Sequence, residues 1–329
     1  MSRRGDWAMA LRRNGGPLAA LVVFIVMFAL FLVEHPRSIS VAIVTTASNK
    51  AVLLAIVAMA QTLPVITRGL DLSVGMVMVL TGCLASVVVS GAPWQVALGV
   101  VLVLACGAAA GALNGAIVVF GRLQPIIVTL ATGAVYFGFA LLLRPAPGGE
   151  VSEGLSDALT GRVFGVIPTT LVLLAVLVVL GWMPLKRTVI GRACYAVGSS
   201  EQAAYLSGVP SDRAKFLAYT VAGLLSGVAG LLLSLIALSG EASGPQAGLY
   251  TLNSIAAVVI GGTSLYGGTG GMVGSILGAF VLRTIGDLLF VFNAPALWQP
   301  LFEGLILLAA VCMGALRVLR VRNRLDLFS

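Results

Sequence analysis

The sequence predicts an all-α, polytopic membrane protein with about ten transmembrane helices. Of its 329 residues, 59% are hydrophobic and only 10% are charged, whereas about a quarter of an average soluble chain is charged. The apolar residues form repeated, continuous runs near the roughly 20 residues that a helix needs to cross a bilayer. A membrane β-barrel would instead show short segments of alternating hydrophobicity. The 40 glycines suit close helix–helix packing in lipid.

The apolar runs divide a single transmembrane domain, residues 1–329, into ten predicted spans. The first run follows four arginines, and Glu34-His35-Pro36-Arg37 after it is no small-residue cleavage site. We therefore expect a retained first helix rather than a signal peptide. The predicted spans are 17–33, 51–67, 72–90, 95–119, 124–143, 166–183, 212–238, 251–265, 271–292 and 298–316.

The basic residues are distributed unequally between the two sides of these spans. With the N-terminus inside, the outer segments hold only Arg37, Lys50, Arg144 and Arg162 of the 20 Lys and Arg residues. This asymmetry follows the positive-inside rule and predicts cytoplasmic tails at 1–16 and 317–329 in a bacterial inner membrane. Topology and contact with anionic lipid account for the net charge of +8, so nucleic-acid binding is not expected.

A glycine-rich break, Gly69-Leu-Asp-Leu-Ser-Val-Gly75, separates the second and third spans. Glycine permits a tight reversal of the backbone. Asp71 or Ser73 can accept from the free N–H groups of the next helix, and Ser73 is the plain N-cap candidate. A capped turn is the favoured interpretation. A polar re-entrant element near a translocation path is the alternative.

Few polar side chains lie within or beside the spans, and they suit a path for a neutral, hydroxyl-rich solute. A path for cations would require more carboxylates. Hydrogen bonding between helices is the other role open to them. The predicted path or gate residues are Gln61, Asp71, Ser73, Asn114, Thr129, Asn253 and Ser254.

Two series of glycines at four-residue spacing predict close packing of helices, either within the bundle or against a second copy. They are Gly107, Gly111 and Gly115, and Gly270, Gly274 and Gly278. Near the end of the chain, Arg283 precedes Asp287 by four residues, so the two can pair on one helix face. A structural pair is favoured there, and a proton relay using Asp287 and Glu303 is the alternative.

No motif in the chain predicts nucleotide hydrolysis, metal binding or covalent catalysis. The three lysines follow Asn49, Leu185 and Ala214, so no Walker A loop is present. The glycine-rich break Gly262–Gly271 lacks that lysine and predicts a tight hairpin between helices. The four cysteines and the single histidine show no metal-ligand spacing. We therefore expect neither an enzyme nor a metal protein.

The segment 191–212 is polar, rich in small residues and followed at once by a long apolar helix. Glu201, Ala204, Tyr205 and Gly208 fall at helical spacing, which predicts a short helix that Pro210 ends. Such a segment indicates docking of a cytoplasmic partner. No loop is long enough to form a folded domain, so ligand capture and ATP hydrolysis would require separate chains.

From about residue 50 to 315, the chain resembles the permease subunits of ribose-type ATP-binding-cassette sugar importers, which depend on a binding protein. The resemblance rests on the order and spacing of six segments: 69–75, Gly111-Ala-Leu-Asn-Gly115, Gln124–Leu130, Gly191-Arg-Ala-Cys-Tyr-Ala-Val-Gly198, Ala203–Gly208 and Ala256–Gly268. One departure is visible, because no basic residue follows Gly267-Gly268 within a few positions.

The resemblance implies a type II-like importer permease that dimerises with itself or a paralogue. It also implies two cytoplasmic ATPases, which bind ATP and Mg²⁺, and a periplasmic sugar-binding protein; this chain would hold no cofactor. The segment 201–208 looks like the coupling helix that docks on the ATPase. The predicted coupling residues are Gly191, Arg192, Gly198, Glu201, Ala203, Ala204, Tyr205 and Gly208.

These features predict a permease for a small neutral sugar or sugar-like solute. An ion-coupled secondary transporter and a permease for branched-chain amino acids are the alternatives. The residues leave open which sugar or polyol is carried.

Overall fold

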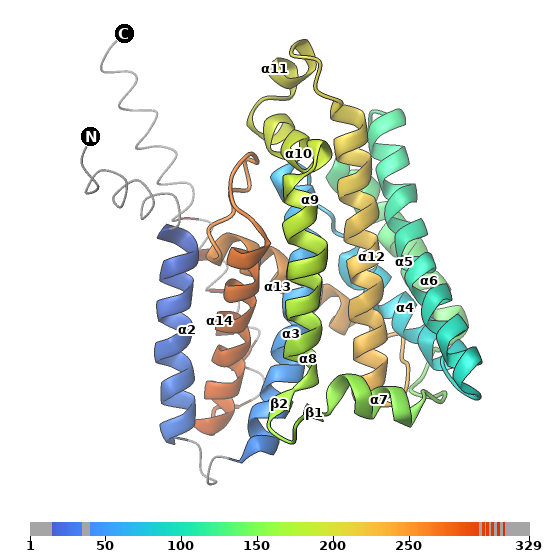
Figure 1. The fold of residues 1–329 in the computed structure, drawn as a ribbon, viewed down its shortest axis with the longest axis vertical. Coiled ribbons are helices and arrows are strands. Elements are labelled where there is room, and N and C mark those ends of the chain that lie inside the picture. Colours follow the sequence, from blue (N-terminus) through green and yellow to red (C-terminus); the bar gives the residue numbers. More distant parts are fainter. Residues whose placement is uncertain are drawn as a thin grey trace.

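The computed structural model describes residues 15–34, 40–295, 298–299, 301–302, 304–305, 308–309 and 312. Its helices run mostly along one long axis and form a bundle (Figure 1). The helical regions long and apolar enough to cross a membrane are α2 (Gly15–Glu34), α3 (Val41–Ile66), α5 (Pro93–Phe120), α6 (Pro125–Leu143), the run Thr169–Arg187, α12 (Ser211–Ala237) and α14 (Met272–Val291). The predicted polytopic helical fold is confirmed, whereas the count of ten helices is not.

Helix α3 is the central element of the bundle. All residues from Ala51 to Ile66 are buried, mainly against α12 and α14. The helix begins ten residues before the predicted span, because the Ser40 hydroxyl accepts from the Ile43 N–H at 3.3 Å. Within that extension, Asn49 Nδ2 donates to the carbonyl oxygen of Thr160 at 2.9 Å. The polar start of α3 is therefore stabilised by a contact with a residue that is distant in the sequence.

Two helices beside α3 are short. Helix α4 (Val74–Val88) has 15 residues, below the roughly 20 that cross a bilayer. Helix α13 (Gly244–Ile260) has 17 residues and begins before the predicted span 251–265. The Gly75 N–H donates to Thr251 Oγ1 at 3.1 Å, so these two helices are in direct contact. The prediction of α4 as a full span, 72–90, was wrong in length.

The predicted span 166–183 is a continuous helical rod of three parts: α8 (Thr169–Val176), the π-helical segment η1 (Leu177–Trp182) and α9 (Met183–Arg187). A short antiparallel hairpin precedes it, with two strands of two residues each, β1 (Arg162–Val163) and β2 (Ile167–Pro168). At the same end of the bundle, α7 (Glu153–Thr160) lies across the long axis of the other helices (Figure 1). Ser156 Oγ in α7 donates to the carbonyl oxygen of Leu235 at 2.7 Å, which attaches this helix to the end of α12.

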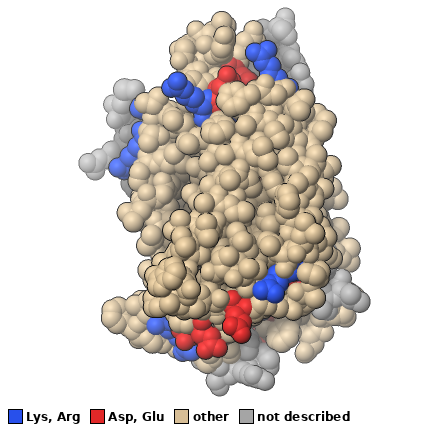
Figure 2. All heavy atoms as spheres, turned by 90° about the vertical axis from the view of Figure 1, so that its right-hand side faces the viewer, with Lys and Arg blue, Asp and Glu red and all other residues tan. Residues whose placement is uncertain are grey.

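After α9, the chain forms α10 (Val189–Ser199) and α11 (Glu201–Leu206) at the opposite end of the bundle from α7 (Figure 1). On the face drawn in Figure 2, charged residues gather near the two ends and an uncharged band lies between them. Exposed apolar side chains, including Leu98, Val101 and Leu142, cover the outer surfaces of α5 and α6. This distribution is typical of a bundle surrounded by lipid.

The glycines of α5 bring that helix directly against α12. A Cβ atom at Gly107 or Gly111 would overlap backbone atoms of Gly223, and a Cβ at Gly115 would lie 3.0 Å from the Phe216 carbonyl oxygen. On α14, a Cβ at Gly274 or Gly278 would overlap backbone atoms at the end of α13. These close approaches all join helices of the same chain.

Gly270 does not share the helix face of Gly274 and Gly278, contrary to the spacing argument. Helix α14 begins at Met272, and Gly270 lies in the preceding loop with a φ of +113°. Its backbone conformation is one that side-chain-bearing residues rarely adopt. Residue 270 therefore shapes the loop rather than a helix interface.

We expect Gly111→Ala to lower the melting temperature of the chain in detergent. The added methyl group would overlap the Tyr219 carbonyl oxygen and the Gly223 Cα atom, neither of which can rotate away. Overpacking of this kind costs about 1–3 kcal/mol. Gly138→Ala on α6 is the matched control, because no atom lies within 4 Å of the place that its added methyl group would take. Equal melting temperatures for the two variants would refute the packing role.

Several sequence predictions fall outside the described residues. These are the N-terminal tail as far as residue 14, His35, Arg37, Glu303 and the tail 317–329. The predicted span 298–316 is described only at isolated positions.

Candidate functional site

The break between α3 and α4 is built around the side chain of Asp71. Asp71 Oδ1 accepts from the Ser73 N–H at 2.9 Å and from Ser73 Oγ at 2.6 Å. Ser73 occupies the N-cap position of α4, but its side chain makes no capping hydrogen bond. The prediction of Ser73 as the capping acceptor was therefore wrong, because its hydroxyl is committed to Asp71. Burial raises the pKa of the Asp71 carboxyl, and the hydrogen bonds from Ser73 oppose that rise.

Helices α5 and α6 hold this break from the side. Asn114 Nδ2 on α5 donates to Ser73 Oγ at 2.8 Å, and Tyr136 Oη on α6 donates to Asn114 Oδ1 at 3.0 Å. Thr129 Oγ1, also on α6, accepts from the Leu72 N–H at 3.0 Å. Helices α5 and α6 thus both contact this loop through hydrogen bonds.

Gln61 completes the network from α3. With its amide oriented so that the nitrogen faces an acceptor, Gln61 donates to the Asp71 carbonyl oxygen at 2.9 Å and accepts from the Asp71 N–H at 3.3 Å. We call the buried network that contains Gln61, Asp71, Ser73, Asn114 and Thr129 the polar junction; each of these five residues is at most 1% exposed. Because these side chains are already hydrogen-bonded within the protein, they favour the interpretation that they connect helices. They do not favour the alternative, in which free polar groups line a path.

The other two predicted path residues lie on α13. The Ser254 hydroxyl donates within its own helix to the carbonyl oxygen of Thr251 at 2.7 Å, so Ser254 is outside the polar junction. Asn253 is its half-buried neighbour on the same helix.

The predicted pair on α14 is present. Arg283 Nη2 lies 3.0 Å from Asp287 Oδ1, and both side chains are mostly buried, with 25% and 19% exposed. This i, i+4 arrangement pairs the two charges with each other. It therefore supports the structural interpretation of Asp287 rather than a proton relay.

The segment 191–212 folds as two capped helices. The Thr188 hydroxyl accepts from the Gly191 N–H at 3.0 Å at the start of α10, and the Ser200 hydroxyl accepts from the Ala203 N–H at 3.3 Å at the start of α11. Side-chain oxygens at these positions satisfy the free N–H groups of a helix start. The short helix predicted over 201–208 is thus present as α11.

Gly208, rather than Pro210, ends α11. Its φ of +74° is the left-handed conformation that glycine adopts readily. The Val209 N–H then donates back to the Ala204 carbonyl oxygen at 3.0 Å, which is the hydrogen bond of a glycine-terminated helix end. The prediction from Pro210 was incorrect because the chain has already reversed two residues earlier.

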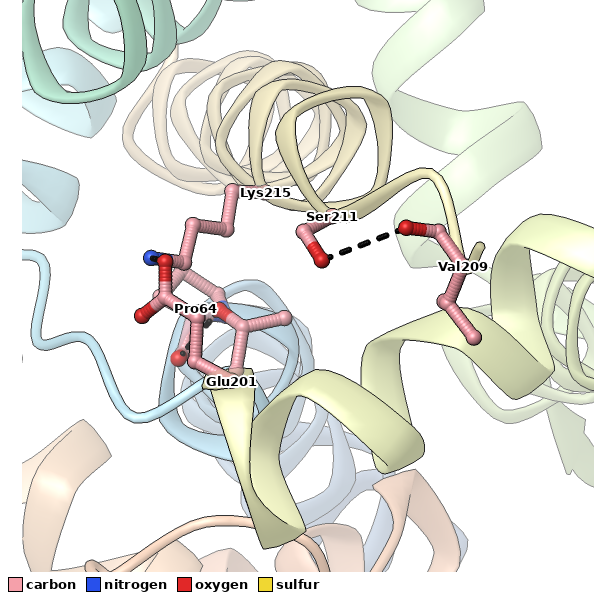
Figure 3. Close-up of polar contacts among 6 residues, drawn as sticks. Pro64, Glu201, Val209, Ser211 and Lys215 are labelled. Atoms are coloured by element: carbon pink, nitrogen blue, oxygen red, sulfur yellow. Dashed lines mark hydrogen bonds and ion pairs between the residues drawn. The ribbon is translucent and has the colours of Figure 1, made fainter. Parts of the chain in front are cut away.

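Helix α11 exposes two large apolar side chains. Tyr205 is 74% exposed and Leu206 is 78% exposed, whereas Ala204 is buried toward the protein. Figure 1 shows α11 at the tip of the molecule. At the start of the helix, Glu201 Oε1 lies 2.5 Å from Lys215 Nζ of α12 (Figure 3). The ion pair links the start of this exposed helix to α12.

The predicted residues around α11 differ in their surroundings. Ala203 and Arg192 are exposed, and Gly191 is buried where a Cβ atom would overlap the Leu185 carbonyl oxygen. Gly198 is the most closely packed of this group, since a Cβ there would overlap both the Ile66 carbonyl oxygen and the Gly268 nitrogen.

Gly198 lies at a contact between three segments, which we call the α10 junction: α10, the end of α3 and the loop Gly262–Gly271. The Gly268 N–H donates to the Ile66 carbonyl oxygen at 3.0 Å. Tyr195 Oη of α10 donates to the Gly270 carbonyl oxygen at 2.9 Å. Sequence reasoning identified Gly198 and the loop separately. The two are some 70 residues apart, and nothing in the sequence except the two clusters of glycine indicated that they would be in contact.

The α10 junction is continuous with the loop that enters the polar junction. Arg68 follows α3 directly, and its Nε donates to the Tyr266 carbonyl oxygen at 3.0 Å. Three residues later, Asp71 is the centre of the polar junction. The chain therefore provides an unbroken path of contacts from α11 through α10 to the break between α3 and α4.

Comparison with known proteins gives a consistent result. Residues 43–311 match the family model described as branched-chain amino acid transport system / permease component. The ribose import permease protein of Haemophilus influenzae is 33% identical over 300 residues, covering 89% of this chain and 91% of that protein. The autoinducer 2 import system permease protein of Enterobacter sp. is 34% identical over 313 residues, covering 93% and 89%.

A third relative shows a similar level of identity. The ribose import permease protein of Bacillus subtilis is 31% identical over 303 residues, which cover 91% of each chain. No solved structure shows a significant match.

Proposed function

The chain belongs to this family of transport-system permease components, and we propose that it is the membrane-spanning subunit of an ATP-driven importer for a small neutral sugar or sugar-like solute. The observation that carries the proposal is the 31–34% identity, over about nine-tenths of each chain, to permeases named for ribose and autoinducer 2. The chain is a multi-pass membrane protein and a transport subunit. The two other functions considered, an ion-coupled transporter and a branched-chain amino-acid permease, are not favoured.

The proposed partner at α11 is a cytoplasmic ATPase that binds ATP and Mg²⁺. The exposed Tyr205 and Leu206 provide the kind of compact aromatic and aliphatic anchor that protein interfaces use. The proposal sets α11 and both tails on the cytoplasmic side of the bacterial inner membrane, in agreement with the excess of basic residues on that side of the predicted spans. A periplasmic binding protein delivers the solute at the end that carries α7, and a second permease subunit completes the transporter.

In this mechanism the permease performs no covalent chemistry. ATP binding closes the ATPase pair and displaces α11, and the α10 junction transmits the displacement to the end of α3. The polar junction keeps that end attached to α5 and α6, so the helices move as a unit between two arrangements. The energy of ATP binding acts by stabilising one arrangement relative to the other.

The proposal is tested by purifying the tagged chain from its native host in mild detergent and identifying the proteins that accompany it. We expect an ATPase with a Walker A motif. Tyr205→Asp should release this ATPase, because a carboxylate would replace an exposed aromatic anchor. Trp94→Asp, at an exposed position at the start of α5, is the control and should retain it. A chain that is purified alone, while other complexes from the same cells remain intact, would contradict the proposal.

A further inference from the structure

A cavity of about 540 Å³ lies at the α11 end of the bundle. Its walls come from four segments: the loop that follows α3, the turn between α5 and α6, α11, and the first turns of α12. The turn consists only of residues 121–124 and joins two helices that are long enough to span the membrane. The cavity therefore lies at the level of the lipid head groups, where a spanning helix ends.

The lining of the cavity has a net positive charge once its ion pair is counted. Its charged residues are Arg68, Arg122, Lys215, Glu201 and Asp212. Glu201 and Lys215 lie 2.5 Å apart and neutralise each other (Figure 3). Two guanidinium groups then remain against the single carboxylate of Asp212. Because guanidinium groups bind phosphate oxygens through pairs of hydrogen bonds, this balance favours a phosphate-bearing anion.

Both arginines have a backbone conformation that is uncommon for a residue with a side chain. Arg68 follows α3 with a φ of +65°, and Arg122 follows α5 with a φ of +51°. Glycine is the usual residue in this left-handed conformation just past a helix end, because it has no Cβ atom. Residues held in such conformations are concentrated at functional sites. Arginine at both helix ends therefore indicates a role for the two guanidinium groups beyond ending the helices.

The two guanidinium groups differ in their protein contacts. Arg68 Nε donates to the Tyr266 carbonyl oxygen at 3.0 Å, so this arginine also belongs to the contacts around the α10 junction. Arg122 is exposed, and its side chain makes no hydrogen bond or ion pair with any described residue. A guanidinium group has five N–H donors. Arg122 can thus bind an anion without losing a protein contact, and it can be changed without disturbing the α10 junction.

An exposed apolar surface begins at the edge of the same cavity. Leu123 lines the cavity and is 54% exposed. Beyond it, Ile127 and Leu130 lie on one face of α6, and each is 63% exposed. Figure 2 shows basic side chains at the α11 end of the molecule, next to the uncharged band. A cationic cavity at head-group level, continued by an apolar surface, matches a phospholipid, in which a phosphate is joined to acyl chains.

We propose that this cavity binds the phosphate group of an anionic phospholipid, with an acyl chain of the same lipid along Leu123 and α6. In the proposed orientation, the lipid belongs to the cytoplasmic leaflet. A soluble anion or an acidic segment of the ATPase would use the arginines but not the apolar surface, so the lipid accounts for both features. The bound lipid connects the loop after α3 to the turn between α5 and α6. The inference requires a membrane-spanning chain and does not depend on the proposed cargo.

The test measures the binding of individual lipids to the purified full-length chain by native mass spectrometry. The probes are phosphatidylglycerol, which is anionic, and phosphatidylcholine, which has no net charge, both with the same acyl chains. We expect the native chain to bind phosphatidylglycerol more tightly. Arg122→Gln should weaken phosphatidylglycerol binding roughly fivefold, as expected for one basic residue near an anionic lipid, and leave phosphatidylcholine binding unchanged.

Arg213→Gln is the matched control. Arg213 is exposed in the first turn of α12 at the same end of the bundle, and it does not line the cavity. Its variant loses the same charge and should bind phosphatidylglycerol like the native chain. Asp212→Asn removes the carboxylate that opposes the phosphate and should strengthen phosphatidylglycerol binding. This second variant keeps the test decisive, because a gain in affinity cannot result from misfolding.

Four results would overturn the lipid site while leaving the proposed function intact. Equal affinity of the native chain for the two lipids, or equal losses in Arg122→Gln and Arg213→Gln, would leave only a general attraction to anionic lipid. Unchanged phosphatidylglycerol binding in Asp212→Asn would show that the lipid does not lie in the cavity. Displacement of the lipid by the same concentration of inorganic phosphate would assign the cavity to a soluble anion. Loss of the lipid when the ATPase binds would assign it to an acidic segment of that partner.

Discussion

Gly198→Ala is expected to reduce ATP-driven uptake strongly while the chain still inserts in the membrane. The new methyl group would overlap the Ile66 carbonyl oxygen and the Gly268 nitrogen, which are themselves joined by a 3.0 Å hydrogen bond. Because both are backbone atoms, the overlap can be relieved only if α10 moves away from the end of α3. Helix α11, at which the ATPase is proposed to dock, would then move without displacing the transmembrane core.

The measurement combines uptake with co-purification of the ATPase. Coupling free energies between sites are about 1–3 kcal/mol, so a lost connection should reduce uptake roughly 5- to 150-fold. The ATPase should still bind, because α11 remains exposed. Gly181→Ala is the control, since a methyl group added there would have no atom within 4 Å. Normal uptake by Gly198→Ala would show that the α10 junction does not transmit the displacement.

Glu201→Lys is expected to uncouple ATP hydrolysis from uptake. The change places two ammonium groups where Glu201 and Lys215 now lie 2.5 Å apart, so the start of α11 is repelled from α12. The free energy of unfolding should change by no more than about 1 kcal/mol, because Glu201 is exposed and exposed ion pairs contribute little. Uptake should nevertheless decrease strongly, since α11 would dock in an altered position. Uptake, ATP hydrolysis and the amount of chain in the membrane are measured together.

The double variant Glu201→Lys with Lys215→Glu separates two explanations of that effect. It restores an ion pair between α11 and α12 with the charges exchanged. If Glu201 acts by positioning α11, uptake should recover in the double variant. Continued loss of uptake would instead place Glu201 in direct contact with the partner, and native uptake in the single variant would remove it from coupling altogether.

The parts of the fold that depend on continuous apolar runs were predictable from the sequence. The runs at 95–119 and 124–143 agree with α5 and α6 to within two residues. The start of α3 was not predictable, because its first ten residues include Thr45 and Asn49. The structure satisfies them through Val41 and Thr160, and the second of these partners lies 111 residues away from Asn49. Local hydropathy contains no information about such a contact.

The candidate site shows the same division. Residue type alone identified Asn114 and Thr129 as unusual polar groups in apolar helices. Their hydrogen bonds to the α3–α4 break cross 41 and 57 residues, so their assembly into the polar junction required the fold. Similarly, Gly208 was predicted to be a coupling residue, but its role in ending α11 depends on a backbone φ that the sequence does not specify.

The most direct test of the account is transport by purified components. The chain is reconstituted in vesicles with its co-purifying ATPase, and uptake of labelled ribose is followed with and without ATP and the binding protein. We predict accumulation that requires both and that persists when the proton gradient is dissipated. Accumulation that occurs without ATP and disappears with the proton gradient would contradict the importer assignment and favour an ion-coupled transporter.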